Sequence, residues 1–129
     1  MNGTRYLIDT NFFIDYFKNE PYAVSFFAEI MDCVLLTSVI NRMELLCSGG
    51  ITEDEEVRTL DLLKIFRIVP LCREVEQKAV AIRRATGRKL PDAIVAASAL
   101  HADAILITSD KPLATTSFPG LRAVNPMIR

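Results

Sequence analysis

The sequence predicts an α/β fold in which helices cover both faces of a parallel sheet. Two observations predict it: short apolar runs that lack the alternation of half-exposed strands, and segments of helical periodicity that separate these runs. The chain has 129 residues, of which 50% are apolar, and this size and composition suit one domain with one buried core. No linker, repeat or low-complexity segment divides it. We therefore expect residues 1–129 to form a single three-layer α/β/α domain with about five strands.

Strand-like and helix-like segments alternate along the chain. The expected strands are residues 6–8, 33–37, 67–71, 104–108 and, at an edge, 121–124. The expected helices are residues 12–17, a segment that starts at Glu20-Pro21, residues 39–47, a segment from Thr52 to Phe66, and residues 73–86 and 91–101. This alternation is typical of a doubly wound sheet.

Capping residues and apolar stripes refine these helices. Thr10 or Asn11 is expected to cap the first helix, Ser38 the third, and the Thr52-x-x-Glu55 capping box the fourth. The second helix has an apolar stripe of Ala23, Val24, Phe27, Ala28 and Met31. The third has one of Val39, Ile40, Met43, Leu46 and Cys47. Glu44 borders the latter stripe, so we expect its side chain to be partly covered.

Charge and cysteine content exclude several classes of protein. The formal net charge of −1 argues against a protein that coats nucleic acid through bulk positive charge. Cys33, Cys47 and Cys72 are odd in number and widely spaced, which predicts buried free thiols in a reducing compartment rather than a disulfide framework or a zinc site. We see neither a membrane span nor a signal peptide, and expect a cytoplasmic protein.

Four acidic residues are expected at one edge of the sheet. Asp9 ends the first strand and Asp110 lies two residues beyond the fourth, so both belong at the carboxyl edge. Asp92 is in the first turn of the helix that precedes the fourth strand, which also starts near this edge. Glu44 is about 9 Å along its helix, but helical side chains lean toward the N-terminus, so its carboxylate can reach the same place.

Four carboxylates in one crevice would repel each other unless a cation were present. Their hard oxygen atoms suit Mg²⁺ or Mn²⁺, which can lower the pKa of a water molecule and stabilise the oxyanions of a phosphodiester. The expected chemistry is therefore metal-assisted hydrolysis of phosphodiester bonds. Thr10, Asn11, Thr108 and Ser109 are candidates to support these acids by hydrogen bonds or to hold substrate oxygen.

Each of these acids except Asp9 also has a purely structural interpretation. Asp92 can be a helix N-terminal charge, Asp110 a turn residue, and Glu44 a half-exposed helix residue. The basic residues Arg84, Arg88 and Lys89 can guide phosphates to the acids, or can equally be a solvated helix end. His101 is expected to be structural, because it is at the opposite end of its helix from Asp92.

Four motifs resemble those of the PIN-domain nucleases, in the same order along the chain. They are Leu7-Ile8-Asp9-Thr10-Asn11, the segment from Ser38 to Leu46, Leu90-Pro91-Asp92-Ala93 with Ala96-Ala97, and Ile107-Thr108-Ser109-Asp110. The resemblance implies a Rossmann-like fold with strand order 3-2-1-4-5 and an acidic site for Mg²⁺ or Mn²⁺. The motif acids of that family correspond to Asp9, Glu44, Asp92 and Asp110.

A PIN domain of this length looks like the VapC-type toxins of toxin–antitoxin pairs. That resemblance implies an endoribonuclease that forms a homodimer and is inhibited by a small antitoxin protein. Two alternatives stay open: a PIN-fold module that binds a partner without catalysis, and a PIN nuclease of RNA processing that has no antitoxin. A third, an aspartyl-phosphate or receiver domain, lacks the D-x-D pattern that its nucleophile requires.

Overall fold

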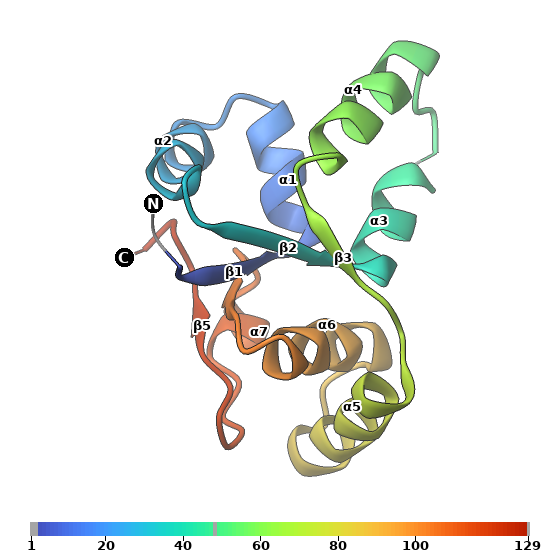
Figure 1. Cartoon of the computed structure of the whole chain (residues 1–129), viewed down its shortest axis with the longest axis vertical. Coiled ribbons are helices and arrows are strands. Elements are labelled where there is room, and N and C mark those ends of the chain that lie inside the picture. The colour runs from blue at the N-terminus through green and yellow to red at the C-terminus, as the bar shows by residue number, and fades with distance from the viewer. Residues whose placement is uncertain (1–2, 48, 129) are drawn as a thin grey trace.

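The computed structural model describes residues 3–47 and 49–128, which form a five-stranded parallel sheet between two layers of helices (Figure 1). The strands are β1 (Arg5–Ile8), β2 (Val34–Ser38), β3 (Arg67–Val69), β4 (Ile105–Ile107) and β5 (Ala123–Val124). Their order is β3-β2-β1-β4-β5, and every neighbouring pair is parallel. The α/β class predicted from the sequence and the strand order implied by the resemblance are thus confirmed. The sheet changes winding direction between β1 and β4.

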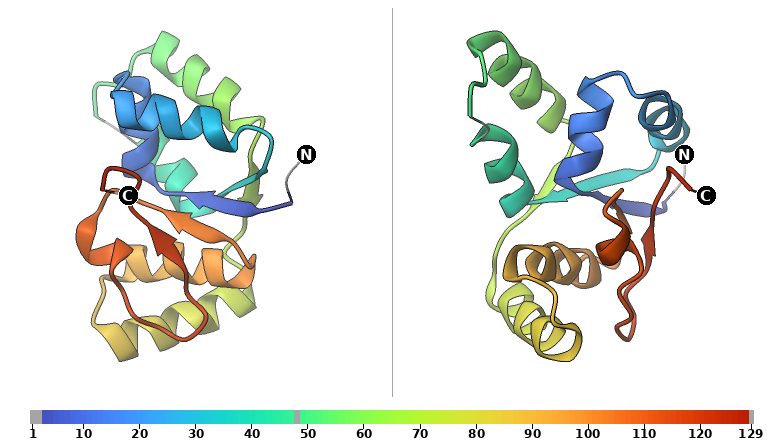
Figure 2. Two further views of the ribbon diagram at one scale, coloured as in Figure 1. Left: turned by 90° about the vertical axis from the view of Figure 1, so that its left-hand side faces the viewer. Right: turned by 180° about the vertical axis from the view of Figure 1, so that it is seen from behind.

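The helices divide into two layers, one on each face of the sheet (Figures 1 and 2). One layer consists of α1 (Thr10–Phe17), α2 (Pro21–Ile30) and α4 (Glu53–Leu63), and the other of α5 (Arg73–Thr86), α6 (Leu90–His101) and α7 (Lys111–Ala114). Helix α3 (Val39–Leu46) follows β2 and contacts both α1 and α6. Sequence analysis did not predict α7, a single turn that Pro112 makes difficult to distinguish from a loop.

The two faces of the sheet have different cores. Phenylalanine rings fill the first, where Phe12, Phe13, Phe26, Phe27 and Phe66 pack mostly edge to face. Small side chains dominate the second. Helix α6 buries its alanines against the sheet and α5. They lie at positions Ala93, Ala96, Ala97 and Ala99.

Helix α2 buries a different face from the one predicted. Its buried residues are Ala23, Phe26, Phe27 and Ile30, whereas Val24, Ala28 and Met31 are exposed. The reason is the size of Phe26, whose ring packs edge to face against Phe12 and Tyr6. Burying this ring removes more apolar surface from water than burying Val24 would, so the helix is turned toward it.

The predicted stripe of α3 is correct only in part, because Val39, Ile40 and Leu46 are half-buried but the other two members are exposed. Met43 is 57% exposed and Cys47 is exposed, while Asn41 and Leu45 are buried. Hydrogen bonds of Asn41, described below, set the rotation of this helix. The prediction of buried thiols fails as well, because Cys33 and Cys72 are half-buried and Cys47 occupies the exposed C-cap of α3.

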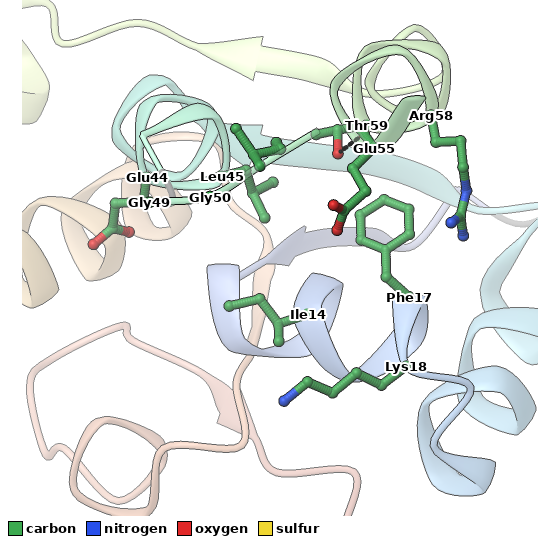
Figure 3. A pocket seen from close by; sticks show the side chains of 11 residues that line it. Ile14, Phe17, Lys18, Glu44, Leu45, Gly49, Gly50, Glu55, Arg58 and Thr59 are labelled. Atoms are coloured by element: carbon green, nitrogen blue, oxygen red, sulfur yellow. Dashed lines mark hydrogen bonds between the residues drawn. The ribbon is translucent and has the colours of Figure 1, made fainter. Parts of the chain in front are cut away.

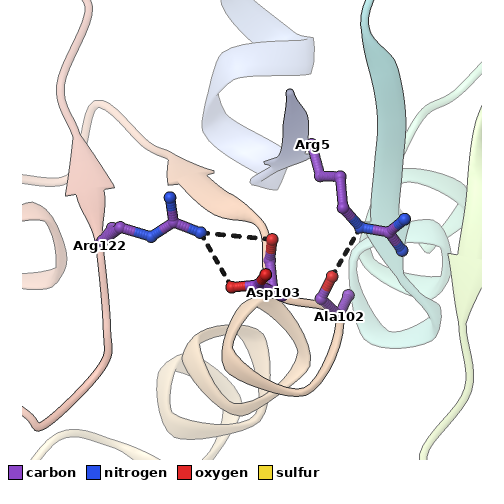
Figure 4. Close-up of polar contacts among 4 residues, drawn as sticks. All are labelled: Arg5, Ala102, Asp103 and Arg122. Atoms are coloured by element: carbon purple, nitrogen blue, oxygen red, sulfur yellow. Dashed lines mark hydrogen bonds and ion pairs between the residues drawn. The ribbon is translucent and has the colours of Figure 1, made fainter. Parts of the chain in front are cut away.

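Helices α5 and α6 form a hairpin that places the start of α6 at the carboxyl edge of the sheet. Helix α5 spans the predicted residues and ends at Gly87, whose φ of 73° is the left-handed conformation that glycine adopts without strain. At the far end of α6, Arg5 donates a hydrogen bond to the carbonyl of Ala102, and Arg122 contacts Asp103 (Figure 4). These contacts hold the turn from α6 into β4.

None of the helices within residues 3–47 and 49–128 has both the length and the hydropathy to cross a lipid bilayer.

Candidate active site

Asp9 lies at the point where the sheet changes winding direction. It directly follows β1, and its backbone N–H donates to the carbonyl oxygen of Ile107 at 2.9 Å, so it is tied to the end of β4. Ligands of open α/β sheets bind at this position, outside the carboxyl ends of the strands. Asp9 also caps α1, because its side chain accepts from the backbone N–H of Thr10. The helix therefore begins at Thr10, and the prediction of a cap at Thr10 or Asn11 was wrong.

The carboxylate of Asp9 is almost enclosed, with 7% of the residue exposed. Its Oδ1 accepts from Asn41 Nδ2 and from the Thr10 backbone N–H, both at 2.9 Å, and its Oδ2 accepts from Thr108 Oγ1 at 2.8 Å. Burial raises the pKa of Asp9 to about 6, and the negative charge of Glu44 adds a little to the rise. The three hydrogen bonds oppose the rise, so they favour the charged form.

Asn41 is a residue that the sequence analysis did not select. It is 0% exposed, and its Oδ1 accepts from the backbone N–H of Ser38 at 3.1 Å and from the hydroxyl of Thr37 at 3.3 Å. Its Nδ2 donates to Asp9 and to the hydroxyl of Thr10, in each case at 2.9 Å. The spacing Ser38-x-x-Asn41, which forms a capping box, is the sequence pattern that could have identified Asn41. The same amide thus starts α3 and positions Asp9.

Glu44 is linked to this network through Thr10. The hydroxyl of Thr10 accepts from Asn41 and donates to Glu44 Oε1 at 2.7 Å. Glu44 itself is exposed, so the predicted partial cover is wrong; the rotation of α3 that buries Asn41 and Leu45 leaves Glu44 on the outer side. Within the described part of the chain, one hydroxyl holds its carboxylate, and the exposed remainder is open to a ligand.

The segment after β4 connects Asp9 with Asp110. The hydroxyl of Thr108 accepts from the backbone N–H of Asp110 at 3.1 Å and from Asn11 Nδ2 at 3.3 Å. Asn11 Oδ1 accepts from the backbone N–H of Ser109 at 3.2 Å. Thr10 and Thr108 therefore hydrogen-bond directly to acids, whereas Asn11 contacts the hydroxyl of Thr108 and the backbone of Ser109.

Asp110 and Asp92 are both at helix N-termini. Asp110 caps α7, and its Oδ2 accepts from the backbone N–H of Leu113 at 3.1 Å; its interpretation as a simple turn residue is thus corrected. Asp92 is half-buried in the first turn of α6. Burial raises the pKa of Asp92, and the charges of Asp110 and Glu44 raise it further. The three carboxylates of Asp92, Asp110 and Glu44 are therefore near enough for their charges to interact.

No three His, Cys, Asp or Glu side chains among the described residues are grouped closely enough to form a ready metal cage. The donor set nevertheless suits a hard divalent cation, because its ligands are all carboxylates. Burial is the main cause that raises the pKa of Asp9 and Asp92, repulsion from the neighbouring acids adds to it, and a bound cation would offset both. The residues present therefore fit Mg²⁺ or Mn²⁺ in chemistry.

The three basic candidates lie differently with respect to these acids. Lys89 is the N-cap residue of α6 and Arg88 precedes it, and the positive charges of both lower the pKa of Asp92 against the larger effects that raise it. Arg84 is exposed in the last turn of α5, and no contact joins it to an acid in the part of the chain that the structure describes. The structure brings Arg88 and Lys89, but not Arg84, to the crevice.

A second hollow adjoins the acidic crevice and shares Glu44 with it. It lies between α1 on one side and α3 and α4 on the other (Figure 3). Ile14, Phe17 and Leu45 give it an apolar floor, and its rim is charged. The rim residues are Lys18, Glu44, Glu55 and Arg58, the last of which lies over the ring of Phe17 at 5.6 Å.

The profile of the PIN domain family matches residues 6–119 of the chain. The fold is similar to that of a chain in a toxin–antitoxin complex from Klebsiella pneumoniae, with 30% identity, a TM-score of 0.79, and coverage of 94% of this chain and 97% of that chain. Comparison with curated proteins found no match.

Two further solved structures show the same fold at lower identity. VapBC-1 from nontypeable Haemophilus influenzae matches with 21% identity and a TM-score of 0.76, over 96% of this chain and 99% of that chain. VapBC2 from Rickettsia felis, bound to a promoter DNA fragment, matches with 16% identity and a TM-score of 0.75, over 95% and 98%.

Proposed function

Since the chain belongs to the PIN-domain family, we propose that it is a divalent-metal-dependent endoribonuclease and the toxin of a toxin–antitoxin pair. The observation that carries the proposal is the set of four carboxylates at the carboxyl edge of the sheet, organised around the buried Asp9. Such a site fits metal-assisted hydrolysis of a phosphodiester, and its position at the carboxyl edge, where α/β sheets bind ligands, supports the proposal.

We assign Asp9, Glu44, Asp92 and Asp110 to the binding of Mg²⁺ or Mn²⁺. The cation would supply charge to stabilise the oxyanions of the phosphodiester and would lower the pKa of water. Asp9 is held by three hydrogen bonds and so sets the position of the site. Thr10 orients Glu44, and Thr108 connects Asp9 to the backbone of Asp110. Arg88 and Lys89 supply positive charge beside Asp92, where RNA phosphates would lie.

Cleavage of labelled single-stranded RNA tests this proposal. Wild type should cleave in Mn²⁺ or Mg²⁺ and stop when a chelator is added, and Asp9→Asn should be inactive while still folded. Asp54→Asn is a matched control, because Asp54 is an exposed residue of α4 outside the acidic crevice. Cleavage that survives both the chelator and the Asp9→Asn change would refute the proposal.

An antitoxin partner is the second part of the proposal. The apolar hollow beside Glu44 could hold a segment of a small protein, and a segment lying there would reach the acidic crevice and block it. The similarity to a chain of a toxin–antitoxin complex supports this assignment. Purification from the native host should yield a stoichiometric small protein, whose removal releases nuclease activity.

A homodimer and a cytoplasmic location complete the proposal, and sedimentation analysis of the isolated chain tests the dimer.

A non-catalytic binding module is the alternative that one observation favours: no three acids within residues 3–47 and 49–128 form a closed metal group. Such a module would dock a basic protein segment in the crevice and would take up no Mn²⁺ there. Calorimetric titration with Mn²⁺ separates the two functions, because the nuclease predicts binding that Asp9→Asn abolishes.

A further inference from the structure

Arg88 links the two helices that carry Asp92 and Asp110. It directly precedes Lys89, the N-cap of α6, and Asp92 is in the first turn of that helix. Its Nε donates to Thr116 Oγ1 at 2.9 Å, and Thr116 lies just beyond α7, the helix that Asp110 caps. Thr116 is itself buried, at 9% exposed, and its hydroxyl donates a hydrogen bond to the carbonyl oxygen of Pro112 at 2.9 Å. The guanidinium is therefore anchored on the flank of the acidic crevice.

The backbone around Arg88 is equally well held. Arg83 Nη1 donates to the carbonyl oxygens of Gly87 at 2.7 Å and of Arg88 at 3.0 Å. The backbone N–H of Arg88 donates to Thr86 Oγ1 at 3.2 Å. Gly87 turns the chain in a left-handed conformation. The backbone of Arg88 therefore has a fixed position, so less conformational entropy is lost when a ligand binds its side chain.

Arg88 is close enough to Asp92 for its charge to act on that carboxyl, yet it makes no ion pair with it. The ion pairs found among the described residues join Lys64 to Asp61 and Arg122 to Asp103, both far along the chain from Arg88. Among residues 3–47 and 49–128, the partner of the Arg88 guanidinium is Thr116, bonded to Nε, and the fork of terminal N–H groups suits the paired oxygens of a phosphate.

We propose that Arg88, anchored by Thr116, is a substrate-binding residue that holds an RNA phosphate next to the scissile bond on the Asp92 and Asp110 side of the crevice. This inference rests on the proposed nuclease function. It assigns the contact to Arg88 rather than to Arg84, which makes no contact with an acid among the described residues. If Arg88 had only a structural role, its bond from Nε to Thr116 would be sufficient, and its terminal N–H groups would have no function.

Steady-state cleavage of labelled RNA by Arg88→Ala, Arg88→Lys and Thr116→Val tests it. Arg88→Ala should raise KM about 10-fold or more, because a charge-assisted phosphate contact is lost. The salt dependence of log KM should become shallower by about 0.7, the value for one phosphate of a single strand. Arg88→Lys should recover part of the affinity and the full salt dependence. Thr116→Val should raise KM less and keep the salt dependence, because the charge remains.

Two further measurements separate binding from structure. Mn²⁺ affinity of Arg88→Ala, measured by calorimetry, should be equal to or higher than that of wild type, because a positive charge beside the acids has been removed. Arg73→Ala, a change of an exposed arginine at the opposite end of α5, should leave KM unchanged. The inference is overturned if Arg88→Ala keeps the wild-type KM, or if it loses Mn²⁺ affinity and thermal stability together with RNA affinity. Absence of any RNA cleavage by wild type would instead refute the nuclease proposal on which it rests.

Discussion

The two halves of the acidic crevice are built differently. Asp9 is buried and accepts three hydrogen bonds from α1, α3 and the end of β4, so its carboxylate has one position. On the other half, Glu44 is exposed and Asp92 and Asp110 are half-buried, with one hydroxyl holding Glu44 and one backbone N–H holding Asp110. Folding thus fixes the carboxylate of the buried half. The carboxylates of the open half are held less firmly, and we expect a bound cation and substrate to order them.

This difference in burial explains why the residues that hydrogen-bond to the acids are concentrated around Asp9. A buried carboxylate without partners would cost several kcal/mol, so Asp9 needs Asn41 and Thr108 to be charged at all. An exposed carboxylate is solvated by water and needs no such supports. Four predictions test how far the buried half controls the site.

The largest effect is expected from Asp9→Asn. The substitution removes the central carboxylate while an amide of the same shape fills its place. Cleavage should fall at least about 1000-fold, because electrostatic stabilisation by a metal site is worth several kcal/mol. The circular dichroism spectrum should be unchanged. Retention of even a tenth of the wild-type rate would show that the buried half is not the centre of the site.

The second-largest effect is expected from Asn41→Ala. It leaves the backbone N–H of Ser38 and a lone pair of Asp9 without their amide partner, which should destabilise the fold by about 1–3 kcal/mol. The rate of cleavage at saturating Mn²⁺ should fall about 10–100-fold, as for other residues that orient metal ligands. Urea denaturation and RNA cleavage measure the two effects. Met43→Ala, on the exposed side of the same helix, is the control and should change neither.

The pH dependence of stability is expected to come from the buried half. The pKa of Asp9 is about 6 in the folded chain against an ordinary value of 3.8. The folded state therefore binds a proton more tightly than the unfolded state, so the stability of metal-free protein should fall as pH rises from about 4 to 6. The loss should be about 3 kcal/mol. Asp92 shifts in the same direction.

Urea denaturation in chelator between pH 4 and pH 7 measures this loss. Asp9→Asn should have a much flatter profile, because it lacks the group that titrates. An equally steep decline in that variant would assign the pH dependence to other residues.

The smallest effect on stability is expected from Glu44→Gln, in the open half. The side chain is exposed and its one partner, the hydroxyl of Thr10, can also donate to an amide oxygen. The free energy of unfolding should change by less than about 0.5 kcal/mol. Mn²⁺ affinity should still fall, because one charge is lost, but less than in Asp9→Asn. Thermal melts and calorimetry on the two variants side by side would show whether the comparison holds.

Local patterns in the sequence were sufficient for most of the architecture. The spacing of apolar runs predicted the α/β class and all five strands, and Gly87 and the Thr52 capping box predicted helix ends correctly. Which face a helix buries was less predictable. Val24, Met31 and Met43 looked like core residues but are exposed, because long-range contacts of Phe26 and Asn41 decided the rotation of α2 and α3.

The sequence by itself predicted acids after β1 and β4 and at the start of α6, since a parallel topology brings these positions to one edge of the sheet. Only the tertiary structure decided which of them is buried and what holds it. Asn41 reaches Asp9 across 32 positions in the chain and Thr108 reaches it across 99, and local periodicity contains no information at that range. The contact between Arg88 and Thr116 is also long-range, and local sequence patterns do not predict it. It distinguishes Arg88 from the other basic residues near it in the sequence.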